Sequence, residues 1–285
     1  MKILITGGGG YIGSNLKNLL IKKGHDVKTI GLNSQNIVCD ITNFEEVKKH
    51  IKDYDVVYHL AGLILPKESN IVPHKTFLVN SFGTLNILEA CRLNKIKKVI
   101  FTSTSKVYGK PKNLPISESQ TKDPKSAYGY SKLIAEEMCE NYKKRYNMEI
   151  NILRLFNVYG PNQSADLLIP TMLKQLNNEE IKLQGNNSKM DFVYIDDVCN
   201  ALKKCIDTNL EQPVNICTGN SYSASDIVEI LEQITNKKIK LSLKDNRTLS
   251  ENVGDNTLAK KLLNWEPTTN LKDGLTKILN STKEA

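Results

Sequence analysis

The sequence is poor in the residue patterns that mark secreted, metal-binding or membrane proteins. Its 285 residues include six cysteines without a Cys-x-x-Cys pair and four histidines without metal-ligand spacing. We therefore expect buried, reduced thiols, no disulfide framework and no bound metal. No apolar run approaches the roughly 18 residues of a membrane span, and the N-terminal stretch lacks the apolar core and cleavage site of a signal peptide. These absences predict a cytoplasmic protein that does not contact a membrane.

The charge balance is basic but dispersed. The chain has 39 basic and 31 acidic residues, giving a net charge of +8. Such a balance suits an anionic small ligand or a nucleic acid. The lysines are spread along predicted helices, as at Lys48, Lys49, Lys143 and Lys144, which is typical of solvated helix faces. We therefore expect no nucleic-acid partner.

The first half of the chain alternates short apolar runs with longer amphipathic stretches. Strands are predicted at 2–6, 27–30, 37–38, 56–60, 98–102 and 149–156, and helices at 11–23, 43–52, 76–93 and 126–146. This alternation predicts an α/β fold with a parallel sheet covered on both faces. Beyond residue 160 the pattern loosens into helices at 167–176, 196–206 and 225–235 with a strand at 214–216. It predicts a smaller, partly interleaved α/β C-terminal lobe.

A glycine run lies between the first strand and the first helix. It reads Thr6-Gly7-Gly8-Gly9-Gly10-Tyr11-Ile12-Gly13. Glycines permit a tight turn and a close backbone approach to a pyrophosphate, while the helix N-terminus offers free N–H groups and a positive dipole. The run therefore predicts a Rossmann-type doubly wound sheet, with Gly7, Gly10, Tyr11, Ile12 and Gly13 at the dinucleotide. We expect this domain at 1–160 plus about 191–217, and the ligand lobe at 161–190 and 218–285.

The end of the second strand bears on which dinucleotide binds. NAD-preferring folds usually place Asp or Glu there, on the ribose 2′-hydroxyl. Here the strand ends in Gly31-Leu32-Asn33-Ser34, without a carboxylate. Asn33 and Ser34 could donate hydrogen bonds to a 2′-phosphate, although no arginine is nearby. NADP(H) is therefore favoured, with NAD(H) as the alternative.

A tyrosine and a lysine with helical spacing form a candidate catalytic pair. Tyr128 and Lys132 lie four residues apart, so both project from one helix face. An ammonium group beside a phenol favours the phenolate, which suits proton transfer coupled to hydride transfer. The hydroxyl-rich run 102–105 follows the predicted strand at 98–102, where a parallel sheet presents ligand groups. Taken alone, each pattern also fits a surface helix or an ordinary turn.

Taken together in order, these segments resemble the extended short-chain dehydrogenases/reductases that act on sugar nucleotides. The resemblance covers nearly the whole chain and rests on TGGGGYIG, His59-Leu60-Ala61-Gly62, Val79-Asn80, TSTSKVYG, SAYGYSK, 154-RLFNVYGP, 191-DFVYIDDV and 264-NWEP. It implies Thr104, Tyr128 and Lys132 as catalytic residues and Asn157 as a contact of the substrate diphosphate. It also implies that Asp40, Ile41, Leu60, Ala61, Gly62, Asn80, Tyr128 and Lys132 contact the cofactor.

Departures from the family pattern bear on the reaction. Family dehydratases carry an Asp-Glu pair where this chain has Ser105 and Lys106, so a 4,6-dehydratase is not expected. Family epimerases commonly carry an arginine where Met190 stands, and Arg247 is a candidate replacement for its phosphate contact. Together with the end of the second strand, these differences favour reduction, by NADPH, of the C4 ketone of a nucleotide-linked 4-keto-6-deoxyhexose.

Two alternatives use the same residues differently. In the first, the chain keeps NAD and works as a nucleotide-sugar 4-epimerase; in the second, more remote one, it is a non-catalytic dinucleotide sensor. The resemblance also implies a homodimer, formed through helices near 82–93 and 126–146. Leu85, Leu88, Leu133 and Met138 could serve either that interface or the core.

Overall fold

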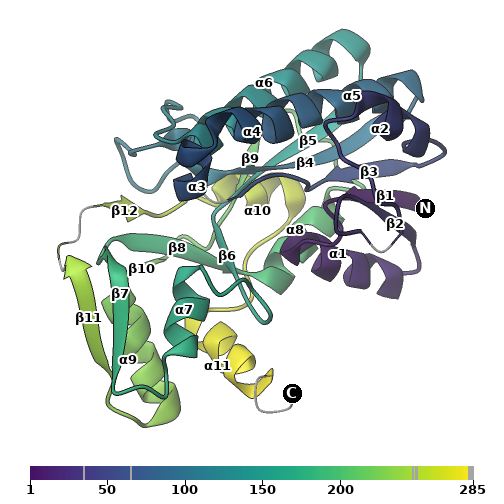
Figure 1. Cartoon of the computed structure of the whole chain (residues 1–285). Coiled ribbons are helices and arrows are strands. Elements are labelled where there is room, and N and C mark those ends of the chain that lie inside the picture. The colour runs from purple at the N-terminus through teal and green to yellow at the C-terminus, as the bar shows by residue number, and fades with distance from the viewer. Residues whose placement is uncertain (35, 65, 246, 248–249, 282–285) are drawn as a thin grey trace.

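The computed structural model describes residues 1–285 except 35, 65, 246, 248–249 and 282–285. It contains a parallel-sheet lobe and a smaller lobe beside it (Figure 1). The elements up to the fifth long strand are β1 (Lys2–Thr6), α1 (Tyr11–Lys22), β2 (Asp26–Ile30), α2 (Phe44–His50), β3 (Val56–His59), α3 (Pro66–Ile71), α4 (Pro73–Phe77), the π-helix η1 (Leu78–Phe82), α5 (Gly83–Leu93), β4 (Lys98–Thr104), the 3₁₀-helix η2 (Ser105–Tyr108), α6 (Ala127–Tyr146) and β5 (Glu149–Leu155).

The rest of the chain builds the smaller lobe and returns once to the main sheet. Its elements are β6 (Asn157–Tyr159), α7 (Leu168–Lys174), β7 (Glu180–Asn186), β8 (Lys189–Tyr194), α8 (Ile195–Lys204), β9 (Val214–Ile216), β10 (Ser221–Tyr222), α9 (Ala224–Thr235), β11 (Lys240–Asp245), β12 (Glu251–Asn252), α10 (Thr257–Leu263) and α11 (Leu271–Ser281).

The main sheet has six parallel strands in the order β2-β1-β3-β4-β5-β9. Because successive side chains of a strand point to opposite faces, β1 contributes to two cores. Ile3 and Ile5 pack with α1 and α8, whereas Leu4 packs with α2, α5 and α6. Figure 1 shows these helix layers on opposite sides of the sheet. The predicted Rossmann-type doubly wound α/β fold is confirmed.

The order reverses at β1, which lies between β2 and β3. Chain connections therefore diverge at its carboxyl end, and the glycine run begins there. This is the place where open α/β sheets bind ligands.

The smaller lobe joins the main one through interleaved strands. β8 pairs with β6, β10 and β12, and β7 pairs with β11 in a separate parallel pair. The chain then re-enters the main sheet through α8 and β9. Within the described residues, no helix is long and apolar enough to cross a membrane.

Two local predictions were wrong. The strand predicted at 37–38 is reduced to one isolated bridge between Ile37 and Ile30, because the backbone bonds of this stretch to β2 are those of Ile37 with Thr29 and Gly31. The helix predicted at 76–93 is divided into α4, the π-turn η1 and α5. The π-turn allows Asn80 and Ser81 to face α6, where both side chains bond Ser131. A local apolar pattern cannot reveal such long-range hydrogen bonds.

Candidate active site

The glycine loop turns directly from β1 into the N-terminus of α1. Gly7 has a φ of +70°, and a Cβ there would lie 2.7 Å from the backbone nitrogen of Ala61. A Cβ on Gly13 would lie 2.3 Å from the carbonyl oxygen of Gly7. Helix α1 has Gly10 as its N-cap, without a side-chain cap or an acidic residue in its first turn. Its first N–H groups, starting at Tyr11 and Ile12, therefore suit an anion.

The loop after β2 lies against the glycine run. A Cβ on Gly9 would come within 2.2 Å of the backbone oxygen of Asn33, and Asn33 itself is exposed. Ser34 is engaged within the loop, because its hydroxyl donates to the carbonyl oxygen of Thr29 at 2.7 Å. It also accepts the N–H groups of Asn36 and Ile37, both at 3.2 Å. Of the two predicted 2′-phosphate donors, only Asn33 therefore keeps its donor group uncommitted.

The two predicted adenine contacts, Asp40 and Ile41, differ in their exposure to solvent. Asp40 is exposed, and its carboxylate accepts the backbone N–H and the hydroxyl of Thr42, both at 2.9 Å. Ile41 is buried beneath α5, with its side chain against Gly83 and its carbonyl bonded by Asn86. Asp40 thus presents a polar group to solvent, while Ile41 anchors the segment in the core.

Asn80 secures the loop that follows β3, which carries Leu60, Ala61 and Gly62. The Asn80 side chain accepts the N–H of Leu63 at 2.7 Å and donates both to its carbonyl and to Ser131 Oγ, each at 3.0 Å. Because all these partners belong to the protein, Asn80 acts on the site by positioning this loop against α6.

His59 lies beneath the same loop in a fixed chain of hydrogen bonds. Thr84 donates its hydroxyl proton to the Asn80 carbonyl at 2.6 Å, so it accepts from His59 Nε2 at 2.9 Å. His59 Nδ1 therefore accepts from Thr6 Oγ1 at 2.7 Å, while Thr6 accepts the N–H of Ala61. Burial, and secondly the charge of Lys132, lowers the pKa of His59 to about 3. The imidazole is neutral, with its proton on Nε2.

The predicted catalytic hydroxyls meet at the carboxyl end of β4. Thr104 is the last residue of that strand and is buried. Its side chain lies beside that of Tyr128 in the first turn of α6. Burial raises the pKa of Tyr128, and the Thr104 side chain partly offsets this. Tyr128 keeps part of its surface open to solvent, as a group that exchanges protons with a ligand requires.

Lys132 lies one turn further along the same helix. Its side chain is buried, with Nζ 4.1 Å from the ring centroid of Phe101, a cation–π distance. Burial lowers the pKa of Lys132 to about 8, and Cys139 and Glu136 oppose that shift. The causes that shift the pKa of Tyr128 are burial and Thr104, so activation of Tyr128 by Lys132 stays a prediction.

Sequence reasoning missed the capping of this helix by α3. Asn70 accepts the N–H of Ala127 at 2.9 Å, and Ser69 accepts the N–H of Tyr128 at 3.1 Å. The helix's own N-cap, Ser126, accepts the N–H of Gly129 at 3.1 Å. The Ser126 cap could be read from the sequence as a serine before a helical run. The contribution of α3, from 57 and 59 residues away, could not.

A buried ion pair joining α6 to β5 was also missed. Arg154 binds the Glu136 carboxylate at 2.7 Å, and both side chains are 2% exposed. Ser103, beside Thr104, donates to the same carboxylate at 2.5 Å, and Arg154 also bonds the hydroxyl of Tyr108 at 2.8 Å. Glu136 follows Lys132 by four residues, so the helical spacing that marked the catalytic pair could have extended to it.

The predicted substrate residues lie in the smaller lobe and at its junction. Asn157 begins β6 and donates its side-chain amide to the Asp191 carbonyl at 2.8 Å. Arg247 is largely exposed and pairs with Asp245 at 2.8 Å. Its carbonyl accepts the N–H of Asn187, beside the start of β8. Met190, where an arginine was noted as missing, lies within β8.

Two aspartates of the segment 191–198 hold the scaffold together through hydrogen bonds to backbone N–H groups. Asp191 accepts the N–H groups of Thr218, Gly219 and Gly254, and Asp197 accepts those of Thr268 and Thr269. The buried Trp265 donates to the Asp197 carbonyl at 2.9 Å. The segments 191–198 and 264–267 are therefore bonded to each other, and this contact stabilises the junction of the lobes.

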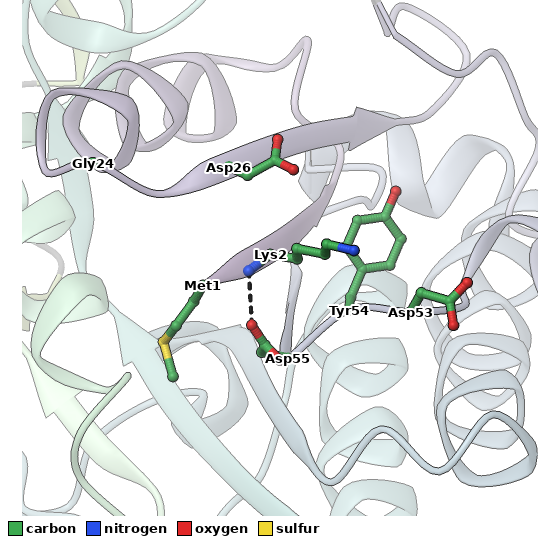
Figure 2. Close-up of a pocket in the computed structure, with 7 residues that line it drawn as sticks. All are labelled: Met1, Lys2, Gly24, Asp26, Asp53, Tyr54 and Asp55. Atoms are coloured by element: carbon green, nitrogen blue, oxygen red, sulfur yellow. Dashed lines mark hydrogen bonds between the residues drawn. The ribbon is translucent and has the colours of Figure 1, made fainter.

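A hollow at the opposite edge of the sheet has different chemistry. Figure 2 shows it at the amino ends of β1 to β3, lined by Met1, Lys2, Gly24, Asp26, Asp53, Tyr54 and Asp55. The backbone N–H of Lys2 donates to Asp55 at 2.7 Å. With three carboxylates around it, this hollow is unsuited to a diphosphate. Among the described residues, no cluster of His, Cys, Asp or Glu could hold a metal ion.

The sequence and the fold of this chain are similar to those of known nucleotide-sugar enzymes. The chain is 32% identical to the Bacillus subtilis protein named uncharacterized UDP-glucose epimerase YtcB, covering 97% of this chain and 96% of that protein. It is also 32% identical to the UDP-glucuronate 4-epimerase of Thermodesulfobacterium geofontis, covering 99% and 96%. The Bacillus cereus UDP-glucuronic acid 4-epimerase, solved with UDP-glucuronic acid and NAD, matches with a TM-score of 0.90, 31% identity and coverage of 100% and 99%. Residues 3–217 match the model of the NAD dependent epimerase/dehydratase family. The chain belongs to this family, as an enzyme of the extended short-chain dehydrogenase/reductase type.

Proposed function

We propose that the enzyme is an NAD-dependent 4-epimerase of a UDP-linked sugar. The observation that carries this proposal is the placement of Thr104 beside Tyr128 at the carboxyl end of β4, one turn from Lys132. Several of the similar proteins are named as 4-epimerases, and the Bacillus cereus enzyme among them was solved with NAD. They favour the epimerase over the NADPH-dependent reductase that the sequence first favoured. The non-catalytic sensor is set aside, because the family consists of enzymes.

The residues of the glycine loop fit a dinucleotide. Gly7 and Gly13 leave no room for a Cβ between β1, α1 and the loop after β3, and α1 has no capping side chain. A pyrophosphate could therefore accept hydrogen bonds from the first backbone N–H groups of α1. Asn33 lies where a ribose hydroxyl could meet it. NAD carries no 2′-phosphate, so an arginine is not required there.

Tyr128 transfers the proton at the C4 oxygen, and Thr104 positions that oxygen. Bound NAD would supply a hydride acceptor and donor for C4, with the hydride returned to the opposite face of the sugar. Tyr128 Oη, as the phenolate, would accept the proton of the C4 hydroxyl during oxidation and give it back to the C4 oxygen during reduction. Thr104 Oγ1 holds the same oxygen in place. Because burial raises the pKa of Tyr128, it needs a nearby cation to lose its proton, and we assign this role to Lys132.

The diphosphate of the substrate would lie toward the smaller lobe. Asn157 has one amide hydrogen and its carbonyl oxygen beyond the bond to Asp191. Arg247 would have to leave Asp245 to reach a phosphate, a modest cost for an exposed pair. The division into two lobes near residue 160 remains part of this proposal.

The first experiment is to denature the purified enzyme and identify any released dinucleotide by mass. The proposal expects NAD or NADH, and interconversion of the C4 epimers of a UDP-sugar without added reductant. Released NADPH together with consumption of added NADPH would instead support the reductase.

Replacing Tyr128 tests the mechanism. Tyr128→Phe should lower turnover at least about 100-fold, since it removes the group that transfers the proton, while binding of the UDP-sugar persists. Tyr130→Phe, two residues along and exposed, is the matched control with normal turnover. Near-normal activity of Tyr128→Phe would exclude the mechanism.

A further inference from the structure

Lys106 lies between the two catalytic hydroxyl-bearing segments. It belongs to η2, and its backbone N–H donates to Thr104 Oγ1 at 3.2 Å. Its carbonyl oxygen lies against the first turn of α6, where a Cβ on Gly129 would come within 2.8 Å. Gly129 is the residue after Tyr128. The backbone of Lys106 thus lies against both Thr104 and the turn that carries Tyr128.

The side chain of Lys106 is a cation in partly buried surroundings. It is half-buried between the buried residues Ser105 and Val107, and burial lowers the pKa of its ammonium group. None of the ion pairs among the described residues includes Lys106. A charge withdrawn from water is unfavourable unless an opposite charge or hydrogen bonds compensate for it. Such a lysine is therefore suited to an anion supplied by the ligand.

The ligand has two candidate anionic groups, and their places on the sugar ring differ. The diphosphate is attached at C1, across the ring from C4. With the C4 oxygen held between Thr104 and Tyr128, C1 and its diphosphate point away from η2. The neighbours of C4 include C5, which bears C6. An acidic group at C6 is therefore the one within reach of a lysine beside Thr104.

We propose that Lys106 is a specificity-determining residue that binds a C6 carboxylate, so that the enzyme prefers a UDP-linked uronic acid over the corresponding neutral hexose. The inference rests on the proposed function, because it takes the C4 oxygen to lie between Thr104 and Tyr128. Two neighbouring features are compatible with it. Ser105 is small and uncharged, and the described residues place no carboxylate in an ion pair with Lys106 that the ligand would have to displace.

The test is a comparison of binding affinities. Calorimetry would give the dissociation constants of UDP-glucuronate, UDP-glucose and UDP for the wild-type enzyme, Lys106→Met, Lys106→Arg and the control Lys110→Met. Lys110 is exposed, just after η2. We expect the wild type and Lys110→Met to bind UDP-glucuronate about 10- to 100-fold more tightly than UDP-glucose, as a charged hydrogen bond would give. Lys106→Met should lose this ratio, and Lys106→Arg should retain much of it. Binding of UDP verifies that each variant is folded.

Equal affinities for the two sugars in the wild type, or a preference that survives in Lys106→Met, would overturn the assignment. Turnover separates this failure from failure of the proposed function. Interconversion of UDP-glucose and UDP-galactose without a preference for the carboxylate would leave the epimerase intact and remove the role of Lys106. A Lys106-dependent preference without epimerisation of either sugar would support the role of Lys106 and contradict the proposed epimerase.

Discussion

At the scale of single residues, the site depends on polar groups whose protonation is set by burial. His59 is the clearest case, since each ring nitrogen has one defined partner, Thr6 or Thr84. A protonated ring would have two donors, and Thr6 would have to give up donating to it. The same chain of hydrogen bonds continues through Ala61 and Asn80 to the loop after β3, which we propose to contact the cofactor. A change of charge on His59 would therefore disturb both stability and the site.

The enzyme should consequently lose stability in mild acid. The folded pKa of His59, about 3, is below the unfolded value of about 6.5, so between these values only the unfolded chain binds the proton. From pH 7 to pH 5 this linkage should lower the free energy of unfolding by about 2 kcal/mol. Urea unfolding at both pH values should show the loss in the wild type and in His74→Gln, an exposed control. His59→Gln should show a loss smaller by that amount; an equal loss would contradict the linkage.

The Glu136–Arg154 pair makes a second residue-scale prediction. Replacing Glu136 by Gln leaves Arg154 as an uncompensated buried charge, which typically costs about 3–5 kcal/mol. Glu137→Gln is the matched control, since its pair with Lys122 is largely exposed and worth at most about 1 kcal/mol. Thermal and urea unfolding would compare the two variants. Similar small losses for both would show that the buried pair adds little.

At the scale of elements, helix α6, which carries the candidate catalytic residues, depends on a segment distant in sequence. Ser69 and Asn70 of α3 accept the N–H groups of Tyr128 and Ala127. Helix α3 therefore helps to position the first turn of α6, which carries Tyr128. Helix α3 also follows directly the loop that carries Ala61 and Gly62. Movement of that loop on binding a ligand could thereby reach Tyr128.

Removing these caps should affect turnover more than stability. Ser69→Ala should cost about 1 kcal/mol of stability, as for other helix caps, and lower kcat roughly tenfold by misplacing Tyr128. Ser126→Ala removes a different cap of the same helix, the one that accepts the N–H of Gly129. It should cost similar stability and cause a smaller loss of kcat. Equal losses of kcat in both variants would mean that helix stability alone matters.

Local patterns predicted most elements of the first lobe but not how they cooperate. Periodicity gave β1, α1 and β4 nearly at their observed bounds, because each buries one apolar stripe or run against the sheet. Helix α6 was also placed correctly, although its buried face is mostly small or polar and includes Lys132 and Glu136. Periodicity failed at η1, where the hydrogen bonds of Asn80 and Ser81 to α6 decide the geometry. It also missed β7 and β11, although Lys240–Asp245 alternates between exposed and half-buried residues as a strand should. The candidate catalytic residues could be named in advance from their motifs, whereas their supporting partners are visible only in three dimensions.

At the scale of the whole molecule, several large apolar side chains of the main lobe are exposed on the neighbouring elements η1 and α6. The side chains of Phe82, Tyr130 and Ile134 are 55%, 47% and 39% exposed, on η1 and α6. Of the residues considered for an interface, Leu88 is buried in the core, while Leu133 and Met138 pack against core clusters. A dimer formed through the expected helices would therefore use largely different side chains from those first considered. Exposed apolar residues grouped on neighbouring helices are typical of a protein contact.

We predict a homodimer that uses this surface of η1 and α6 and that single charges on it would dissociate. Light scattering after size exclusion at micromolar concentration should give the mass of two chains for the wild type. Phe82→Glu and Ile134→Glu should give the mass of one chain, because each would place an unpaired charge inside the contact. Ile21→Glu is the control: Ile21 is 47% exposed, but it belongs to α1, on the opposite side of the sheet (Figure 1). A wild-type mass of one chain would refute the dimer, and dissociation by Ile21→Glu alone would move the interface to the other face.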